Sequence, residues 1–183
     1  IDRDVIIPKK FLSLISSNIS QAENINLYIN ENQVIVEVGN DVFYSRVIDE
    51  RFPDFESVIP KDNNKKLIIN RLEFLSTVKR VSVLSNKTTR QIALNLTKDN
   101  IKITTEDNEK SSKGFENISG SFTGEDLIIG YNAAYLKDIL SHLTTDEIMI
   151  NLNSPISAGL FFPKEQLKDS DLTMLLMPIR LNN

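Results

Sequence analysis

The chain carries one hydrophobic pattern three times. In each copy an Ile-Ile pair is followed, four to six residues later, by an aromatic residue and a leucine. The three copies are residues 4–12, 66–75 and 126–136. Their Ile-Ile pairs end at Ile7, Ile69 and Ile129, so the spacings are 62 and 60 residues. A pattern that recurs at a nearly fixed interval indicates a repeated structural unit.

Each copy opens with β-branched residues and continues with apolar residues at helical spacing, which predicts a short strand followed by a helix. The helical stripes are Phe11, Leu12, Ile15 and Ile19 in the first repeat, Leu72, Leu75, Val78 and Val81 in the second, and Leu136, Ile139, Leu140 and Leu143 in the third. Asn132 stands where the N-cap residue of the third helix is expected.

The rest of each repeat alternates apolar and polar residues, which is typical of strands. These predicted strands are 25–29, 34–38 and 42–47, then 92–96 and 101–104, then 148–152, 159–162 and 174–177. Each repeat is therefore interpreted as a strand, a helix and three antiparallel strands. Helices laid on one face of antiparallel sheets belong to the α+β class.

Repeats one and two are separated by a polar, charged segment, residues 60–66, which is the best candidate for a linker. No comparable break separates the second repeat from the third around Ser119 and Gly120. The second and third repeats are therefore predicted to share one core, while the first has no such partner. The predicted domain division is residues 1–62 and residues 63–183.

Composition excludes several kinds of active site. The chain has 183 residues, 40% of them hydrophobic and 25% charged, which is typical of a globular protein. It contains no Cys, which excludes disulfides, zinc-thiolate sites and cysteine nucleophiles, and its single histidine, His142, excludes multi-histidine metal sites. Neither a glycine-rich dinucleotide loop nor a Gly-Lys-Ser/Thr phosphate loop is present. We therefore expect no cofactor, no metal and no catalytic role.

The sequence also bears on location. No apolar run approaches the ~20 residues that a membrane span needs, and the first residues do not resemble a signal peptide. Together with the absence of Cys, this favours a cytoplasmic protein that does not bind membranes.

The three predicted helices differ in charge from the rest of the chain. The net charge is −4, yet residues 8–20, 70–84 and 131–143 together hold six basic and two acidic side chains. The predicted polar faces are otherwise short: Ser13, Ser16 and Ser17 on the first helix, Ser76, Thr77 and Arg80 on the second, Lys137 and Ser141 on the third. Such a surface fits weak, salt-sensitive contact with a DNA backbone without reading of bases. An ordinary solvated helix face explains the same pattern.

The C-terminal segment, residues 174–181, is too apolar for a frayed tail. One interpretation is a buried final strand that Pro178 ends. The other is an adaptable peptide-binding surface, because methionine-rich surface beside unpaired backbone suits peptide binding.

Several short segments carry a resemblance to a known family. They are Arg51-Phe-Pro-Asp-Phe55 with Val58-Ile-Pro60, Leu84-Ser-Asn86, Ile129-Gly-Tyr-Asn132 with Tyr135, and Met177-Pro-Ile-Arg-Leu181. In order and spacing they resemble the bacterial DNA polymerase III beta subunit, the family of sliding clamps.

The resemblance implies the DNA clamp fold, in which a subunit has three similar domains, each made of two strand-helix-three-strand halves. Two subunits would close head to tail into a homodimeric ring around duplex DNA, with helices lining the hole. Residues 1–62 would be the second half of the middle domain, and residues 63–183 the third domain.

The resemblance also implies a non-catalytic processivity factor. A closed ring keeps a tethered polymerase on its template, and an ATP-driven loader opens it. The implied partners are duplex DNA, bound without sequence preference, the DNA polymerase III alpha subunit, the clamp loader, and repair and other proteins that carry a clamp-binding motif.

In this family, client peptides dock in a pocket between the middle and third domains. The positions of this sequence that match the pocket are Pro53, Ser57, Val58, Asn132, Tyr135, Pro155, Ser157, Leu175, Met177, Pro178, Ile179, Arg180 and Leu181. Ser57 and Thr89 stand where some relatives have an arginine and an aromatic residue, so peptide preference does not carry over.

The DNA-facing positions rest partly on the resemblance. Lys9 and Lys10 match a basic pair at the start of an inner helix, and Arg80 matches a basic position of another. Charge alone adds Arg71, Lys79 and Lys137. The implied subunit contact uses Val83 and Leu84 with an edge strand near residues 109–118.

Two other classes of function remain open at this stage. A peptide-binding scaffold would have the pocket but no contact with DNA. An enzyme would need His142 or a pair of carboxylates in a cleft.

Overall fold

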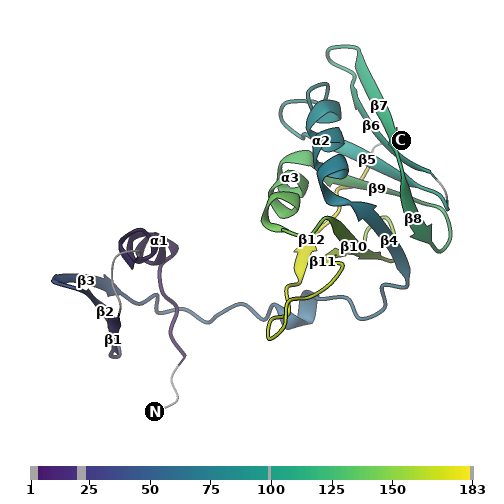
Figure 1. Ribbon diagram of the computed structural model, residues 1–183. Coiled ribbons are helices and arrows are strands. Elements are labelled where there is room, and N and C mark those ends of the chain that lie inside the picture. The colour runs from purple at the N-terminus through teal and green to yellow at the C-terminus, as the bar shows by residue number, and fades with distance from the viewer. Residues whose placement is uncertain (1–3, 20–23, 99, 182–183) are drawn as a thin grey trace. The chain divides into compact units, whose positions relative to one another are not determined.

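The computed structural model describes residues 4–19, 24–98 and 100–181, which form two compact units (Figure 1). Unit 1 ends at Asp54 and unit 2 begins at Phe55. Unit 1 contains α1 (Lys9–Asn18), β1 (Ile25–Ile29), β2 (Gln33–Val38) and β3 (Asp41–Arg46). Unit 2 contains η2 (Glu56–Val58), β4 (Lys65–Asn70), α2 (Arg71–Ser82), β5 (Gln91–Leu96), β6 (Ile101–Asp107), β7 (Ser112–Ile118), β8 (Gly120–Thr123), β9 (Leu127–Asn132), α3 (Ala133–His142), β10 (Glu147–Leu152), β11 (Gly159–Pro163) and β12 (Met174–Leu176).

Unit 1 is an antiparallel sheet of order β1-β2-β3 covered on one face by α1. Alternation in β2 buries Val34, Val36 and Val38, and α1 covers them with Phe11 and Ile15. The helix begins directly after Pro8, whose fixed backbone angle suits the start of a helix. Only two residues of the predicted stripe, Phe11 and Ile15, are buried, and the other two, Leu12 and Ile19, are exposed.

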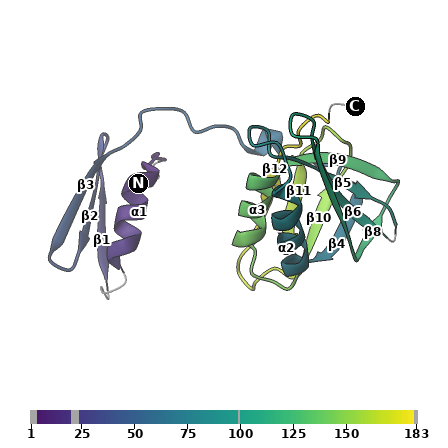
Figure 2. The ribbon, with the colours of Figure 1, turned by 90° about the horizontal axis from the view of Figure 1, so that it is seen from above.

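Unit 2 has two antiparallel sheets, of order β12-β11-β10-β4-β8 and β7-β6-β5-β9. Helices α2 and α3 lie side by side on the same side of the strands (Figure 2). A single hydrophobic core runs through both helices and both sheets, from Leu67 and Phe74 in the second repeat to Leu136 and Ile150 in the third. The prediction of one shared core, and of an α+β fold with helices on one face of antiparallel sheets, is confirmed.

The strand that opens each repeat of unit 2 joins the sheet of the other repeat. Strand β4 pairs with β10, so that Ile69 lies opposite Ile148. Strand β9 pairs with β5, so that Tyr131 lies opposite Ile92. Neither sheet is therefore built from one repeat alone.

All three helices begin at equivalent points, Lys9, Arg71 and Ala133, which are 62 residues apart. Asn70 and Asn132 cap the second and third helices, because their Oδ1 atoms accept hydrogen bonds from the amides of Glu73 (3.0 Å) and Ala134 (2.9 Å). The predicted N-cap at Asn132 is confirmed. Measured from the caps, Tyr131 and not Ile129 is the residue equivalent to Ile69.

The face of α2 differs from the predicted one at two positions. Leu72, expected in the apolar stripe, is exposed, and Phe74 is buried instead. Thr77, expected on the polar face, is fully buried. The stripe of α3 is as predicted, with Leu136 and Leu140 buried.

The polar segment at residues 60–66 is fastened to unit 2. The Asn63 side chain donates hydrogen bonds to the carbonyls of Asn151 and Ala158, both at 3.0 Å. The Asn153 side chain donates to Asp62 at 2.8 Å. Strand β4 begins within the same segment, at Lys65.

Candidate functional site

The six basic side chains expected to face DNA occupy all three helices. Lys9 and Lys10 lie exposed in the first turn of α1. Lys79 and Arg80 lie exposed in the last turn of α2, where a positive charge also favours the helix dipole. Two more lie on the paired helices of unit 2, the half-buried Arg71 and Lys137.

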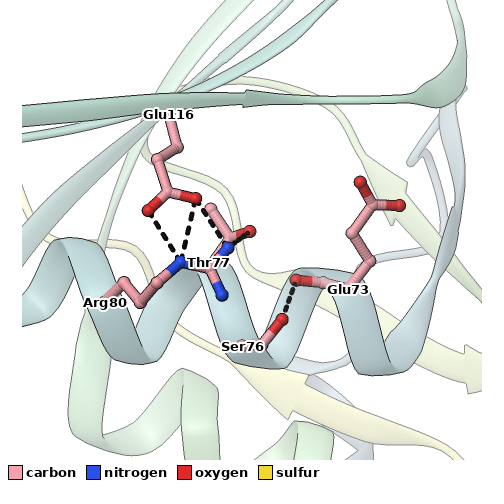
Figure 3. Close-up of polar contacts among 5 residues, drawn as sticks. All are labelled: Glu73, Ser76, Thr77, Arg80 and Glu116. Atoms are coloured by element: carbon pink, nitrogen blue, oxygen red, sulfur yellow. Dashed lines mark hydrogen bonds and ion pairs between the residues drawn. The ribbon is translucent and has the colours of Figure 1, made fainter.

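Arg80 is held by a carboxylate from a strand (Figure 3). Its Nε donates to Glu116 Oε1 at 2.9 Å, and its Nη2 donates to Glu116 Oε2 at 2.7 Å. Nη2 also donates to Thr77 Oγ1 at 3.0 Å, which satisfies the hydroxyl of that buried side chain. This fork-to-fork geometry is the strong form of an arginine–carboxylate pair.

The pair changes the titration of both groups. The hydrogen bond from Arg80 lowers the pKa of the Glu116 carboxyl, and the hydrogen bond to Glu116 raises the pKa of the Arg80 guanidinium. Both groups therefore stay charged at neutral pH. A phosphate that approaches Arg80 must compete with Glu116.

Arg71 is engaged by the backbone of the segment around the end of α3. Its Nε donates to the Thr145 carbonyl at 2.9 Å and its Nη1 to the Leu140 carbonyl at 3.3 Å. The Arg71 amide donates to the Asp146 carbonyl at 2.8 Å. These hydrogen bonds connect the start of α2 to the end of α3. Arg71 therefore has a structural role in addition to any contact with DNA.

The C-terminal segment joins the two sheets of unit 2. Strand β12 pairs with β11, with Leu175 opposite Leu160. Beyond Pro178, the Ile179 amide donates to the Gly130 carbonyl at 2.9 Å, on β9 of the other sheet. Leu176 is buried whereas Met177 is 59% exposed. The segment is therefore a packed strand, residues 174–176, followed by residues 177–181, which cross to β9 and are called the strap below. The peptide-binding interpretation stays a prediction.

Gly130 makes this crossing possible. A Cβ atom at this position would lie 2.6 Å from the Ile179 carbonyl oxygen and 2.6 Å from a methyl carbon of Leu181. Glycine is needed here for close approach of the backbone. The resemblance to the family includes this glycine, but the sequence alone did not show its partner.

The strap lies on β9, the strand that leads into α3. Asn132 caps α3, and its Nδ2 also donates to the Thr89 carbonyl at 3.1 Å. Tyr135, in the first turn of α3, is 64% exposed. The structure therefore places Asn132 and Tyr135 where β9 leads into α3. The strap pairs with the same strand at Gly130, and α3 contacts β12, which holds Leu175.

The turn between β10 and β11 carries two further predicted pocket residues. Pro155 is exposed and Ser157 is half-buried, and the hydroxyls of Ser154 and Ser157 are 2.7 Å apart. Gly159 follows this turn and lies opposite Leu176 of β12. The turn is thus anchored next to the final strand.

The remaining predicted positions are spread over both units. Pro53 belongs to unit 1, whereas Ser57 and Val58 form part of η2 in unit 2 and are exposed. Val83 and Leu84, expected at a subunit contact, follow α2 and are exposed. The Leu84 carbonyl accepts a hydrogen bond from Ser112 on the edge strand β7.

Within residues 4–19, 24–98 and 100–181, no three acidic or histidine side chains gather as metal ligands. Within the same residues, no helix is long and apolar enough to cross a membrane.

Comparison with known families decides the family. Residues 56–180 match the model for the DNA polymerase III beta subunit, C-terminal domain, and residues 2–54 match the model for its central domain. The chain belongs to the DNA polymerase III beta subunit family. The likeness to individual beta sliding clamps extends over almost the whole chain. This chain is 32% identical to the beta sliding clamp of Haemophilus influenzae over 182 residues, and 29% identical to that of Vibrio cholerae over 180 residues.

Solved beta sliding clamps have the same fold. The clamp of Bartonella birtlesii, solved with bound griselimycin, is 31% identical with a TM-score of 0.87, over 97% of this chain and 47% of that one. The clamp of Pseudomonas aeruginosa, also bound to griselimycin, is 28% identical with a TM-score of 0.88, over 98% of this chain and 48% of that one. The fold is therefore the DNA clamp fold. The alignments with the Haemophilus influenzae and Vibrio cholerae clamps cover 98% of this chain but only 48% of the length of each relative. The chain therefore spans about half the length of these relatives.

Proposed function

We propose that this chain forms part of a ring-shaped sliding clamp, the processivity factor of a replicative DNA polymerase. The observation that carries the proposal is the match of both units, in order, to the central and C-terminal domains of the beta subunit. Unit 1 then supplies the second half of the middle domain, and unit 2 the whole third domain. The part has no catalytic step of its own and acts in the cytoplasm.

The helix surface supports contact with duplex DNA. Lys9, Lys10, Lys79, Arg80 and Lys137 lie on helices, with small hydroxyl side chains between them. Arg71 completes the set but already holds backbone carbonyls. A ring needs only weak, sequence-independent contacts, because its closure and not its affinity prevents dissociation. The partial neutralisation of Arg80 by Glu116 suits such a sliding surface.

The strap and the start of α3 support a peptide-binding surface for the polymerase alpha subunit, the clamp loader and repair proteins. Met177 and Tyr135 present large exposed apolar surface next to ordered backbone. Ser57, Val58, Pro155 and Ser157 of unit 2 are proposed to complete the surface. A client side chain that packs against Met177 and Tyr135 would bury both on binding. A few such buried contacts usually account for most of the affinity of a peptide.

Titration of the full chain with griselimycin, the ligand of two related clamps, tests the peptide surface. Amide NMR shifts should concentrate on Asn132, Tyr135 and residues 175–181, and Met177→Ala should weaken binding by about tenfold or more. Leu167→Ala, an exposed leucine outside the proposed surface, is the matched control. Shifts elsewhere, or equal affinity of the Met177 variant, would contradict the assignment.

A second titration with duplex DNA separates the clamp from a peptide-binding scaffold without DNA contact. Binding should be weak, independent of sequence and reduced by salt. Arg80→Ala should lower the affinity for DNA further. His142→Ala should change neither the affinity for DNA nor the affinity for griselimycin. Peptide binding with no salt-dependent DNA binding would favour the scaffold.

A further inference from the structure

A small pocket lies between the end of α2 and the start of α3. It has a volume of about 250 Å³. Three basic side chains line it, Lys87, Arg90 and Lys137. The other described residues of the lining are small or apolar and include Ser82 and Ala133, and none of them is acidic. The lining is therefore positively charged.

The three basic side chains of this pocket have no acidic partner. Within residues 4–19, 24–98 and 100–181, none of them forms an ion pair. Other basic side chains of unit 2 are neutralised: Arg80 by Glu116, Lys113 by Glu106, and Lys164 by Glu147. Like charges around one small pocket repel each other, and a bound anion removes that repulsion. In a chain whose net charge is −4, the pocket is thus a local site for an anion.

Hydrogen bonds fix the segment that supplies Lys87 and Arg90. The side-chain oxygen of Asn86 accepts from the amides of Thr88 (2.9 Å) and Thr89 (3.2 Å). The Arg90 amide donates to the Asn86 carbonyl at 2.8 Å. Arg90 has a φ of 49°, in the left-handed region that few residues with a side chain adopt. The backbone of both basic residues is therefore held in a defined conformation.

The same segment is fastened to the start of α3. The Arg90 carbonyl accepts a hydrogen bond from the Ala133 amide at 2.8 Å. Lys137 follows Ala133 by about one helical turn, so the two residues lie on the same face of α3. The Ala134 amide is also satisfied, by Asn132. The attraction for an anion therefore comes from the basic side chains and not from the helix N-terminus.

We infer that Lys87, Arg90 and Lys137 together hold one backbone phosphate of DNA. The inference rests on the proposed contact with DNA and adds a defined site to it. Three cations around one small pocket suit a phosphate, whose negative charge is shared among several oxygens. A carboxylate is already satisfied by a single arginine, as Glu116 is by Arg80.

The pocket continues the surface of α2 that is proposed to contact DNA. Ser82, which lines the pocket, is one turn beyond Lys79, and its hydroxyl donates to the Lys79 carbonyl at 2.9 Å. Residues three apart in a helix lie on one side of it. At Arg80 a phosphate must displace Glu116, whereas no carboxylate lines the pocket. The pocket should therefore bind a phosphate more tightly than Arg80 does.

Fluorescence anisotropy of a labelled duplex with the full chain, at a series of salt concentrations, tests the site. Lys87→Gln and Lys137→Gln should each weaken DNA binding by about tenfold, because each removes a charged contact. The double variant should reduce the slope of log K against log salt by about 0.9, the share of one phosphate. Two lysines that contact separate phosphates would together reduce the slope by about 1.8, and that result would overturn the inference.

Lys168→Gln is the matched control, because it removes an exposed lysine outside the pocket and should leave DNA binding unchanged. Equal effects of this control and of Lys87→Gln would overturn the inference. If Arg80→Ala weakens DNA binding while Lys87→Gln and Arg90→Gln do not, the proposed function stands and the site is wrong. If the unaltered chain shows no salt-dependent DNA binding, the proposed function and the inference both fail.

Inorganic phosphate gives a direct readout of the same pocket. It should shift the amide NMR signals of residues 85–90 and 133–137 in the unaltered chain and not in Arg90→Gln. Shifts confined to other residues would overturn the inference. A polyglutamate peptide tests an acidic protein partner instead. If Lys87→Gln weakens binding of this peptide and leaves DNA binding unchanged, the pocket serves carboxylates and the inference is wrong.

Discussion

Replacement of Gly130 by alanine should detach the C-terminal strap from unit 2. The new methyl group would lie 2.6 Å from both the Ile179 carbonyl oxygen and a Leu181 carbon. Strand β9 cannot retreat, because β5 pairs with it along its whole length, including Ala93 opposite Gly130. The strap is the freer partner, so Ile179 and Leu181 are expected to move.

The cost follows from what the strap loses. The hydrogen bond from the Ile179 amide to the Gly130 carbonyl contributes about 1 kcal/mol, and overpacking of this kind costs about 1–3 kcal/mol. The two costs do not add in full, because the overpacking disappears once the strap has detached. We expect unit 2 to lose about 1–3 kcal/mol. If the proposed peptide surface binds griselimycin, the ligand should bind at least about tenfold more weakly, because the strap is one wall of that surface.

Thermal unfolding and calorimetric titration measure the two effects, and hydrogen exchange at the Ile179 amide reports the strap directly. A double-mutant cycle isolates the cause: in a chain that ends at Pro178, Gly130→Ala should cost almost nothing further. Ser121→Ala, on β8, controls for a harmless strand substitution. Full protection of the Ile179 amide in the Gly130 variant, together with unchanged ligand affinity, would refute the reasoning.

Three further predictions concern the polar groups of unit 2. Glu116→Gln should free Arg80 for phosphate and steepen the dependence of log K for DNA on log salt by about 0.9, whereas in an Arg80→Ala background it should change nothing. Arg71→Met should lower the free energy of unfolding by about 1–3 kcal/mol in urea, since it removes the bonds to the Thr145 and Leu140 carbonyls, and should weaken DNA binding less than Arg80→Ala does. Burial raises the pKa of the Tyr131 hydroxyl, so the unfolded chain loses this proton first and stability should fall as pH rises above about 10. Urea unfolding at alkaline pH should show a shallower fall for Tyr131→Phe, and an identical fall would contradict the assignment.

The sequence predicted most elements but not how they pair. Alternation identified the strands at residues 25–29 and 148–152 because it reports which side chains share a face. It does not report which strand lies alongside, so the exchange of β4 and β9 could not be predicted. Strand β7 was not identified from its pattern because, as an edge strand, it carries only two large apolar residues, Phe115 and Ile118.

The site could be predicted only in part, for a related reason. The chemistry on α2 was visible as the basic residues Lys79 and Arg80 in one helical turn. Glu116, which pairs with Arg80, lies 36 residues further along the chain, on a strand. Helical spacing cannot indicate a partner that is so far away in the sequence. The pocket residues came from resemblance to the family, and no pattern in the residues themselves placed Gly130 beneath Ile179.

The crossed strands of unit 2 also constrain how the protein folds during synthesis. Strand β4 leaves the ribosome early, but its central neighbour β10 ends at Leu152. Until then Leu67 and Ile69 have no core to enter, and the sheet containing β5 also waits for β9. Such late, non-local pairing slows folding and exposes apolar edges in the meantime. Nascent unit 2 is therefore expected to expose apolar strands until almost all of it has been made.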